Sequence, residues 1–310
     1  MRVAVLGAGA VGCYYGGLLA RGGESVTLVG RPAHVEAIGR DGLVIEWADH
    51  RETIRVGAST DVAAVKDADV VLVCVKSPDT DAAARGLAPH LRTGTIVASL
   101  QNGIDNAERL RGVLTQPVLA AVVYVGAYME GPGVVRHTGR GDLVLGASRA
   151  DAARPDVARG LARVAGMFET AGIGCLVSDD IDVALWTKLA INCAFNAISA
   201  LGRARYGRMA RDPRIRALME GTVRESVAVA RAGGVVLDER RLVDAVWGVA
   251  EALAQQYSST AQDILRGKPT EIDSLNGFVV ARGDALGVDA PINRALHALV
   301  KLREAGDDLA

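Results

Sequence analysis

Cysteine is scarce in this chain, and the four cysteines do not have the spacing of metal ligands. Cys13, Cys74, Cys175 and Cys193 are far apart, and none forms a Cys-x-x-Cys pair. This excludes a disulfide framework and the usual zinc-site spacing, and it indicates small core residues in a reducing compartment. The five histidines also lack a metal-type spacing. The sequence therefore predicts no metal centre.

Strong charge and long apolar runs are also missing. The formal net charge is −1, which argues against a nucleic-acid or anionic-membrane partner. A strand and a glycine-rich turn open the chain, which leaves no room for a signal peptide. No apolar run approaches the ~20 residues of a membrane span. We expect a cytoplasmic protein that binds a small molecule, and a homodimer is compatible with the sequence.

Strands and helices alternate over about 145 residues, which predicts a parallel, doubly wound sheet. The expected strands include Arg2–Leu6, Ser25–Val29, Asp69–Val75, Gly94–Leu100 and Val118–Ala127, with Gly133–Arg136 and Asp142–Leu145 as a closing pair. A β-hairpin is expected over residues 42–56, and helical stretches over 32–40, 81–87 and 104–114.

Helical periodicity dominates from Asp151 onward. The expected helices are 155–171, 181–201, 213–232, 240–257, 272–286 and 291–305, with Cys175–Val177 as a last edge strand. The chain thus reads as a Rossmann-type α/β domain over residues 1–178, followed by an all-α domain over residues 179–310.

A glycine motif lies between the first strand and the first helix. Gly7-Ala8-Gly9-Ala10-Val11-Gly12 has the Gly-x-Gly-x-x-Gly spacing within a β-turn-α-β unit. Gly7 permits the tight turn, Gly9 lets the backbone approach a pyrophosphate, and Gly12 lets helix and strand pack closely. The pyrophosphate would lie at the helix N-terminus, where N–H groups and the dipole favour anions. An ordinary strand-to-helix turn without a ligand is the alternative.

The end of the second strand bears on the choice of dinucleotide. NAD sites place Asp or Glu there, whereas NADP sites place Arg near the ribose 2′-phosphate. Here the chain reads Val29-Gly30-Arg31-Pro32, with no acid before Glu36. Arg31 offers a planar, permanently charged fork suited to a phosphate. The sequence therefore predicts NADPH/NADP, with a solvated surface arginine as the alternative.

Three polar residues recur along the most apolar predicted helix. Lys188, Asn192 and Asn196 are four residues apart and lie along one face, among apolar neighbours such as Leu189 and Phe195. A buried lysine is costly unless it meets an anion or a polar cavity, and asparagine has poor helix propensity. This stripe indicates a substrate-facing surface, unless it is the solvated side of an amphipathic helix.

Further candidates follow strand ends or precede helices. Lys76 and Asn102 come directly after two buried strands, where doubly wound sheets bind ligands. Either could instead be an ordinary loop or turn residue. Ser258-Ser259 and Thr270-Glu271 precede helical segments, and taken alone they read as helix caps.

Taken together, these residues resemble the ketopantoate reductase family, the 2-dehydropantoate 2-reductases. The resemblance covers essentially the whole chain. Its most specific blocks are Gln101-Asn102-Gly103, Lys188-Leu-Ala-Ile-Asn192-x-x-x-Asn196, Ser258-Ser259-x-x-Gln262-Asp263 and Thr270-Glu271-Ile-Asp273-x-x-Asn276-Gly277.

The resemblance implies NADPH-dependent reduction of ketopantoate to pantoate in pantothenate synthesis. By this likeness Lys188 matches the catalytic lysine, and Glu271 a catalytic carboxylate that bonds the substrate hydroxyl. The same likeness implies two sets of ligand contacts: Asn102, Asn192, Asn196 and Ser259 orient substrate or nicotinamide, and Arg31, Lys76 and Asn102 contact the cofactor.

Three positions depart from the family pattern. Thr260-Ala261 stands where Met-x is expected, Ala197 follows Asn196 where many members have Pro, and Gln256 replaces an Asn near the substrate. These departures concern the precise substrate more than the chemistry. Two other classes of function stay open. One is an NADP-dependent reductase or dehydrogenase of another 2-oxo acid, and the other is a non-catalytic NADP-binding sensor.

Overall fold

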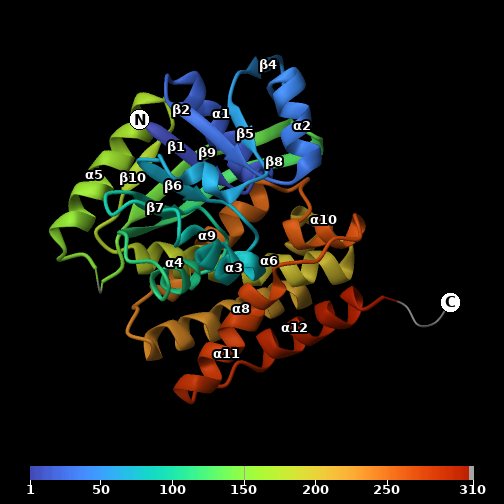
Figure 1. Cartoon of the computed structure of the whole chain (residues 1–310). Helices are drawn as coiled ribbons and strands as arrows, with labels where there is room; N and C mark the ends of the chain where they lie inside the picture. Colours follow the sequence, from blue (N-terminus) through green and yellow to red (C-terminus); the bar gives the residue numbers. More distant parts are fainter. Residues whose placement is uncertain (150, 307–310) are drawn as a thin grey trace. The chain divides into compact units, whose positions relative to one another are not determined.

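The computed structural model describes residues 1–149 and 151–306. The chain divides into two compact units, Met1–Ile181 and Asp182–Ala310. Each unit has its own architecture, and both are shown in Figure 1.

Unit 1 is built on one mixed β-sheet, which among the described residues has ten strands in the order β4-β3-β9-β8-β7-β6-β1-β2-β5, with β10 paired to β9. The strands are β1 Arg2–Leu6, β2 Ser25–Val29, β3 Leu43–Glu46, β4 Arg51–Ile54, β5 Gly57–Ser59, β6 Val70–Val73, β7 Ile96–Ser99, β8 Val118–Gly131, β9 Val134–Gly146 and β10 Cys175–Val177.

Parallel pairing occupies the centre of this sheet. β1 pairs in parallel with β2 and β6, and β7 pairs in parallel with β6 and β8. Every residue of β6 and β7 is buried, as continuous apolar runs in a two-sided sheet should be. Because these strands share a direction, their carboxyl ends meet at one edge.

The long antiparallel ribbon is where the structure departs from the expected closing pair. Residues 134–136 and 142–145 belong to a single strand, β9, which runs antiparallel to β8 through several register shifts, and Gly133 lies in the turn before it. Gly139 and Gly141, both with φ of 154°, lie in this irregular stretch, between the two strands that the sequence predicts. Pairing with β8 from Ala120 to Gly131 joins the two predicted strands into one.

Helices cover both faces of the sheet (Figure 1). They are α1 Ala10–Arg21, α2 Pro32–Asp41, α3 Thr80–Leu87, α4 Asn106–Arg111 and α5 Pro155–Thr170, with short 3-10 turns η1 Val62–Val65 and η2 Ser77–Asp79. α1 and α5 share one face, where the Tyr15 and Phe168 rings meet edge to face at 6.0 Å. Both rings are fully buried, so they anchor the core of unit 1.

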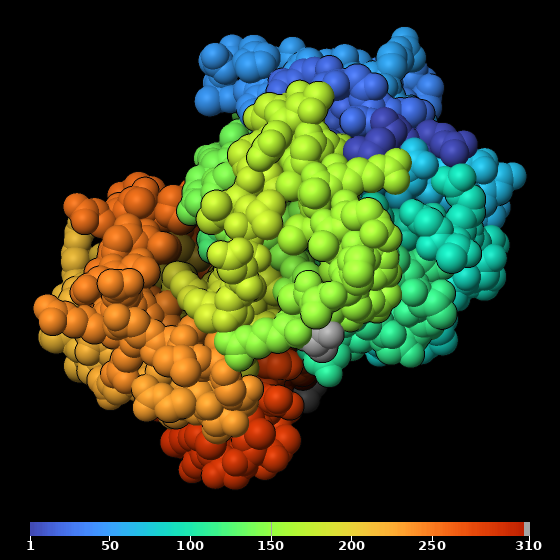
Figure 2. All heavy atoms as spheres, turned by 90° about the vertical axis from the view of Figure 1, so that its left-hand side faces the viewer, coloured from blue at the N-terminus to red at the C-terminus, as the bar shows by residue number. Residues whose placement is uncertain are grey.

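The edge strand β10 stays close to the surface of unit 1. Figure 2 shows the adjoining α5 and β10 residues, yellow-green, among the surface atoms of that view. The Leu176 side chain is 66% exposed, as expected for a short strand paired on one side.

Unit 2 is helical. Its elements are α6 Ile181–Gly202, which starts at the last residue of unit 1, α7 Tyr206–Met209, α8 Pro213–Ala232, α9 Glu239–Ala252, α10 Ser259–Leu265, η3 Ile272–Ser274, α11 Asn276–Leu286 and α12 Pro291–Glu304. The expected helix at 272–286 is split, because Leu275 adopts φ −113° and ψ −105°. The expected helix at 240–257 ends at Ala252, and α7 was not foreseen, whereas α10 follows the Ser258 cap that the sequence suggested.

α6 is long and apolar enough to cross a membrane when length and composition alone are considered. Its apolar window has a mean hydropathy of 1.2, and 56% of that window is buried inside the protein. The expectation that no apolar run approaches this length was therefore too strict. Core helices of soluble proteins pass the same test.

Candidate functional site

The three motif glycines occupy three different steric environments. Gly7 has φ +111°, and a Cβ there would lie 2.7 Å from the Cys74 carbonyl carbon. A Cβ on Gly12 would overlap the Gly7 carbonyl oxygen. By contrast, a Cβ on Gly9 would meet no atom within 4 Å. Packing of the protein itself therefore explains Gly7 and Gly12 but leaves Gly9 unexplained, which fits a backbone that a ligand approaches.

The glycine turn places the N-terminus of α1 at the edge of the sheet where β1 ends. Gly7 and Ala8 donate their backbone N–H groups to Val29 O at 2.8 and 3.2 Å, which ties the turn to the end of β2. Gly9 is the N-cap residue and provides no side-chain cap, and the first turn holds no acid. The first N–H groups of a helix lack intrahelical acceptors, so Ala10 and Val11 present donors suited to a pyrophosphate.

Arg31 lies at the end of the neighbouring strand. The glycine before it lets the end of β2 lie close to the glycine turn, because a Cβ on Gly30 would lie 2.5 Å from the Ala8 side chain. Arg31 is the extended N-cap residue of α2, with Pro32 in the first turn, and it is exposed. The first acid of the segment, Glu36, falls within α2 rather than at the strand end. This geometry suits a ribose 2′-phosphate.

Lys76 and Asn102 follow β6 and β7, and a buried network ties their two loops together. Ser77 Oγ donates to Asn102 O at 2.6 Å. Asn106 Nδ2 donates to the same carbonyl at 2.6 Å and to Ser77 Oγ at 3.1 Å. Gln101 Nε2 adds a bond to Val75 O at 3.1 Å. The two loops are therefore held together as one piece.

Sequence reasoning missed the residues that make this network. Ser77, Thr80 and Asn106 are at most 2% exposed, and Thr80 Oγ1 bridges Gln101 Nε2 and Asn106 Oδ1, both at 2.7 Å. Small polar residues clustered after two buried strands were the available signal. Polar side chains that are fully buried are nearly always hydrogen-bonded, and here their bonds position the loops that carry Lys76 and Asn102.

All the candidate cofactor residues thus follow β7, β6, β1 and β2, which are consecutive strands. Their strand ends lie at the same edge, because the four strands are parallel. The arrangement can hold a dinucleotide along this edge, with the pyrophosphate at α1 and the 2′-phosphate near Arg31.

In unit 2, α6 carries the second group of candidates. Lys188 and Asn192 are half-buried, and Asn196 is 3% exposed. Their neighbours Leu189, Cys193 and Phe195 are at most 2% exposed. The stripe therefore runs along a helix that is packed on several sides, which disfavours the interpretation as a freely solvated helix face.

The start of α10 is docked on the same helix. Ser258 caps α10 by accepting the Ala261 N–H at 3.0 Å, so the capping interpretation is correct for Ser258. Its hydroxyl also donates to Asn196 O at 3.2 Å, and its N–H donates to Ser199 Oγ at 3.2 Å. These bonds hold Ser259, the exposed first residue of α10, beside the Asn196 turn.

The segment with Glu271 is fixed from both sides. Ile272 N donates to Thr270 Oγ1 at 3.2 Å, and Thr270 N donates to Glu304 Oε1 at 2.7 Å. Beyond it, Asn276 Nδ2 donates to Cys193 O at 3.4 Å and to Asn293 Oδ1 at 2.9 Å. Glu271 is half-buried and its side chain makes no capping bond to η3. Capping therefore does not account for this residue.

In the described part of the chain, no group of three His, Cys, Asp or Glu side chains is placed to hold a metal ion. The four cysteines are free. Burial raises the pKa of the Cys13 thiol to about 12 and that of Cys175 to about 11. Such thiols are protonated near neutral pH and are poor nucleophiles.

Comparisons with known proteins cover both units. The family model described as ketopantoate reductase PanE/ApbA matches residues 3–150, and its C-terminal counterpart matches residues 180–304. A 2-dehydropantoate 2-reductase from Halobacterium salinarum is 38% identical, over 98% of this chain and 99% of its own length.

Comparisons with solved structures also find similarity along nearly the whole chain. A PanE/ApbA family ketopantoate reductase from Ralstonia eutropha JMP134 is 49% identical, with a TM-score of 0.90 over 98% of this chain and 99% of that one. D-mandelate dehydrogenase bound to NADH and anilino(oxo)acetate has a TM-score of 0.92 at 23% identity, over 98% of each chain. That second likeness concerns the fold.

Proposed function

This chain belongs to the ketopantoate reductase family, and we propose that it reduces 2-dehydropantoate to pantoate with NADPH, a step of pantothenate biosynthesis. The observation that carries the proposal is the similarity to enzymes of that name over 98% of the chain. It spans the glycine turn of unit 1 and the polar stripe of unit 2, so both halves of the expected chemistry are covered.

Unit 1 is the NADP-binding domain in this proposal. Gly7 through Gly12 and the N-terminus of α1 hold the pyrophosphate, and Arg31 pairs with the 2′-phosphate. Lys76 and Asn102 contact the cofactor from the two loops that the Ser77–Asn106 network holds together. The open space at Gly9 supports this fit, because a ligand can approach the backbone there.

Unit 2 is the substrate and catalytic domain. Asn192 and Asn196 orient the 2-oxo acid along the face of α6, and Asn102 is a further residue proposed to contact substrate. Ser259 bonds the substrate carboxylate, and Glu271 accepts a hydrogen bond from the 4-hydroxyl group of ketopantoate. The docking of α10 and of the 270–276 segment supports these roles, since catalytic groups need fixed positions.

Bound NADPH would supply the hydride that the ketone carbon accepts. As the carbonyl becomes an alkoxide, negative charge develops on its oxygen. The Lys188 ammonium stabilises that charge and then donates its proton to the oxygen. The two amides of the stripe hold the substrate so that its carbonyl oxygen faces Lys188.

Another 2-oxo acid is the second candidate substrate. Thr260-Ala261, Ala197 and Gln256 depart from the family pattern close to the residues proposed to contact substrate, and this favours testing other acids. The experiment is NADPH oxidation, followed by its absorbance, with ketopantoate and a panel of 2-oxo acids. Turnover fastest with ketopantoate supports the proposal, whereas a faster acid replaces it. NADPH binding without turnover on any acid would indicate a non-catalytic sensor.

We also propose that the protein works in the cytoplasm on a small molecule, without a nucleic-acid or membrane partner. A homodimer stays a prediction, which light scattering of the purified protein tests directly.

A further inference from the structure

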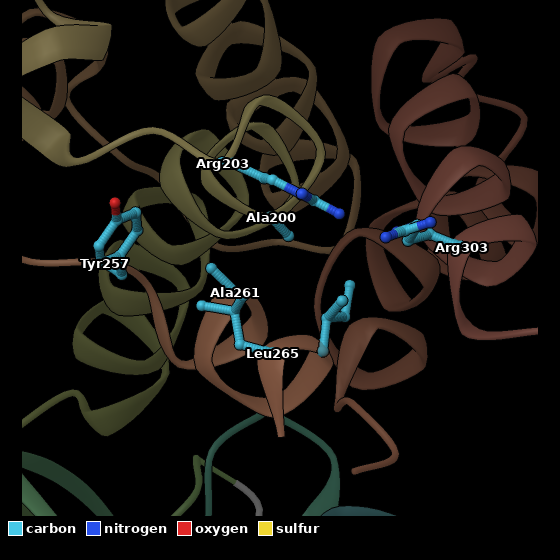
Figure 3. A pocket seen from close by; sticks show the side chains of 7 residues that line it. Ala200, Arg203, Tyr257, Ala261, Leu265 and Arg303 are labelled. Carbon is cyan, nitrogen blue, oxygen red and sulfur yellow. The ribbon is translucent and has the colours of Figure 1, made fainter. Parts of the chain in front are cut away.

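A cavity in unit 2 lies outside the residues assigned above. Its volume is about 220 Å³, and it is lined by Ala200, Arg203, Tyr257, Ala261, Ile264, Leu265 and Arg303. Figure 3 shows Arg203 at the end of α6 and Arg303 on α12, with their guanidinium groups pointing toward one another. The cavity therefore combines an apolar floor with two cations.

Arg203 has an unusual backbone. Its φ is +44°, one of two positive values among the described non-glycine residues. The left-handed region is unfavourable for side chains with a Cβ, and helices that end this way usually place glycine there. Here the glycine, Gly202, comes one residue too early and Arg203 takes the strained position. Strain of this kind tends to mark functional sites.

Hydrogen bonds hold this turn in place. Ser199 Oγ donates to Ala204 O at 2.8 Å, and Ala204 N donates back to Ser199 O at 3.2 Å. Ser199 Oγ also accepts the Ser258 N–H, so the Arg203 turn and the start of α10 share one anchor.

Tyr257 is fixed by its neighbour. The Arg205 guanidinium lies over the Tyr257 ring at 5.4 Å from its centroid and bonds Gln255 Oε1 at 2.7 Å. The wall of the cavity is therefore pre-formed, which lowers the cost of ordering a ligand there.

The lining defines the ligand class. Among the described residues none that lines the cavity is acidic, and two guanidinium forks match the oxygens of a carboxylate or phosphate. The other lining residues include the apolar Ala200, Ala261, Ile264 and Leu265. The volume exceeds a cavity of about 150 Å³ that binds benzene, and it falls below the roughly 300 Å³ at which drug-sized sites begin.

We propose that this cavity is a second ligand site, which binds a small organic anion through Arg203 and Arg303 and packs its compact apolar body against α6 and α10. The site goes beyond the proposed reductase activity, because neither arginine has a role in NADPH binding or in the reduction.

Ala200 and Arg203 follow Asn196 by four and seven residues, so they continue the side of α6 that bears the polar stripe. An anion in the cavity would therefore contact the helix that carries Lys188.

The test is calorimetric titration of the whole protein with four probes. Two are organic anions, 3-methylbutanoate and 3-methylbutyl phosphate. Inorganic phosphate supplies the anionic group without the apolar chain, and 3-methylbutanol supplies the apolar chain without the anionic group. The variants are Arg203→Gly, Arg303→Gln, Lys188→Ala and the control Arg231→Gln, which removes an exposed arginine from the last turn of α8. Melting temperatures verify that each variant folds. Because glycine suits the left-handed position, Arg203→Gly should melt no lower than the unmodified protein.

We expect one of the two organic anions to bind, and each cavity variant to weaken that binding at least tenfold. Arg231→Gln and Lys188→Ala should bind it normally. With no probe present, NADPH oxidation by Arg203→Gly and Arg303→Gln should match the unmodified enzyme, whatever 2-oxo acid proves to be its substrate.

Equal binding by the unmodified protein and both cavity variants overturns the proposal, as does the absence of binding by every anion. Binding lost only in Lys188→Ala overturns it too, because the anion then occupies the proposed catalytic site. Inorganic phosphate that binds as tightly as the organic anions overturns the assigned apolar contact. A failure of ketopantoate turnover bears on the proposed function and leaves these binding results unaffected.

Discussion

His297 Nε2 lies 2.6 Å from Asp273 Oδ1, and this contact joins α12 to the turn that carries Glu271. Lys301 Nζ approaches the other carboxylate oxygen of Asp273 at 3.0 Å and Glu304 at 3.0 Å. Glu304 in turn accepts the Thr270 N–H. Three residues of α12 therefore hold both sides of Glu271.

The contacts of Asp273 with His297 and Lys301, called the ionic clamp below, should make the free energy of unfolding depend on pH. Burial alone would raise the pKa of Asp273, but hydrogen bonds from His297 and Lys301 reverse this and leave it below its ordinary value of 3.8. A lowered pKa adds stability above the unfolded-state pKa, and this stability is lost as pH falls through the folded-state pKa. Asp273→Asn should cost up to about 1 kcal/mol near neutral pH, since the side chain is 57% exposed.

The measurement is the melting temperature of both proteins from neutral pH down to about pH 3. The gap between them should shrink as the pH falls below the ordinary carboxylate range. Asp244→Asn, at an exposed position of α9, is the control and should show no gap. A gap for Asp273→Asn that is constant with pH would contradict an ionic clamp.

The motif glycines should separate stability from cofactor binding. Gly9→Ala adds a methyl group into open space, so the melting temperature should hardly change while NADPH binding weakens at least tenfold. Gly12→Ala forces the methyl group onto the Gly7 carbonyl oxygen and should destabilise the fold by about 1–3 kcal/mol, the usual range for overpacking. Thermal melts and NADPH titrations of both variants decide this. Normal NADPH binding by Gly9→Ala would refute the pyrophosphate assignment.

Arg31 should determine the preference for NADPH. We expect NADPH to bind at least tenfold more tightly than NADH, which is ~1.4 kcal/mol. Arg31→Ala should remove most of that difference by weakening NADPH alone, because NADH lacks the 2′-phosphate. Fluorescence titration with both cofactors measures it. Equal affinities in the unmodified protein would show that Arg31 is an ordinary surface residue.

Lys188 should act on turnover rather than on cofactor binding. Lys188→Ala should lower kcat by about 10²–10⁴, the range for a positioned acid–base group. NADPH affinity should stay the same, since the residues proposed to bind NADPH belong to unit 1. Steady-state kinetics and an NADPH titration test both parts. Lys268→Ala, at an exposed position, is the control, and near-normal turnover by Lys188→Ala would remove the lysine from the mechanism.

Glu271 should discriminate between substrates. Ketopantoate has a 4-hydroxyl that simple branched 2-oxo acids lack, and a carboxylate aimed at it loses that hydrogen bond with the analogue. The enzyme should strongly prefer ketopantoate, and Glu271→Ala should collapse that preference by weakening only the hydroxylated substrate. The kcat/KM values for both acids measure this. An unchanged ratio with stability lowered by about 0.3–1 kcal/mol would instead indicate a helix-terminus role.

Several elements could be read from the sequence because their signals are local. β1, α1 and β2 follow from an apolar run, three glycines and a helical period. α8 starts where Asp212 accepts the Arg214 N–H and Pro213 opens the first turn, a standard start signal. Such signals act within a few residues, so the surroundings rarely override them.

Other elements depended on distant partners. β9 is continuous because β8 pairs along it, although the sequence predicted two separate short strands there. The helix expected at 272–286 is split at Leu275, and the parts on either side are held by Glu304, Asn293 and the Cys193 carbonyl. No window of sequence contains those bonds.

The sequence by itself determined that an α/β part is followed by a helical part, and it supplied the candidate residues from Gly7 to Glu271, since each rests on periodicity, spacing or a family motif. Only the tertiary structure decided that β7, β6, β1 and β2 bring Asn102, Lys76, Gly9 and Arg31 to one edge. It also revealed that Gly9 is unexplained by packing and that Ser77, Asn106 and Ser258 fix the loops around the candidates. These facts depend on hydrogen bonds and close approaches between residues far apart in the chain, and such contacts exist only once the chain has folded.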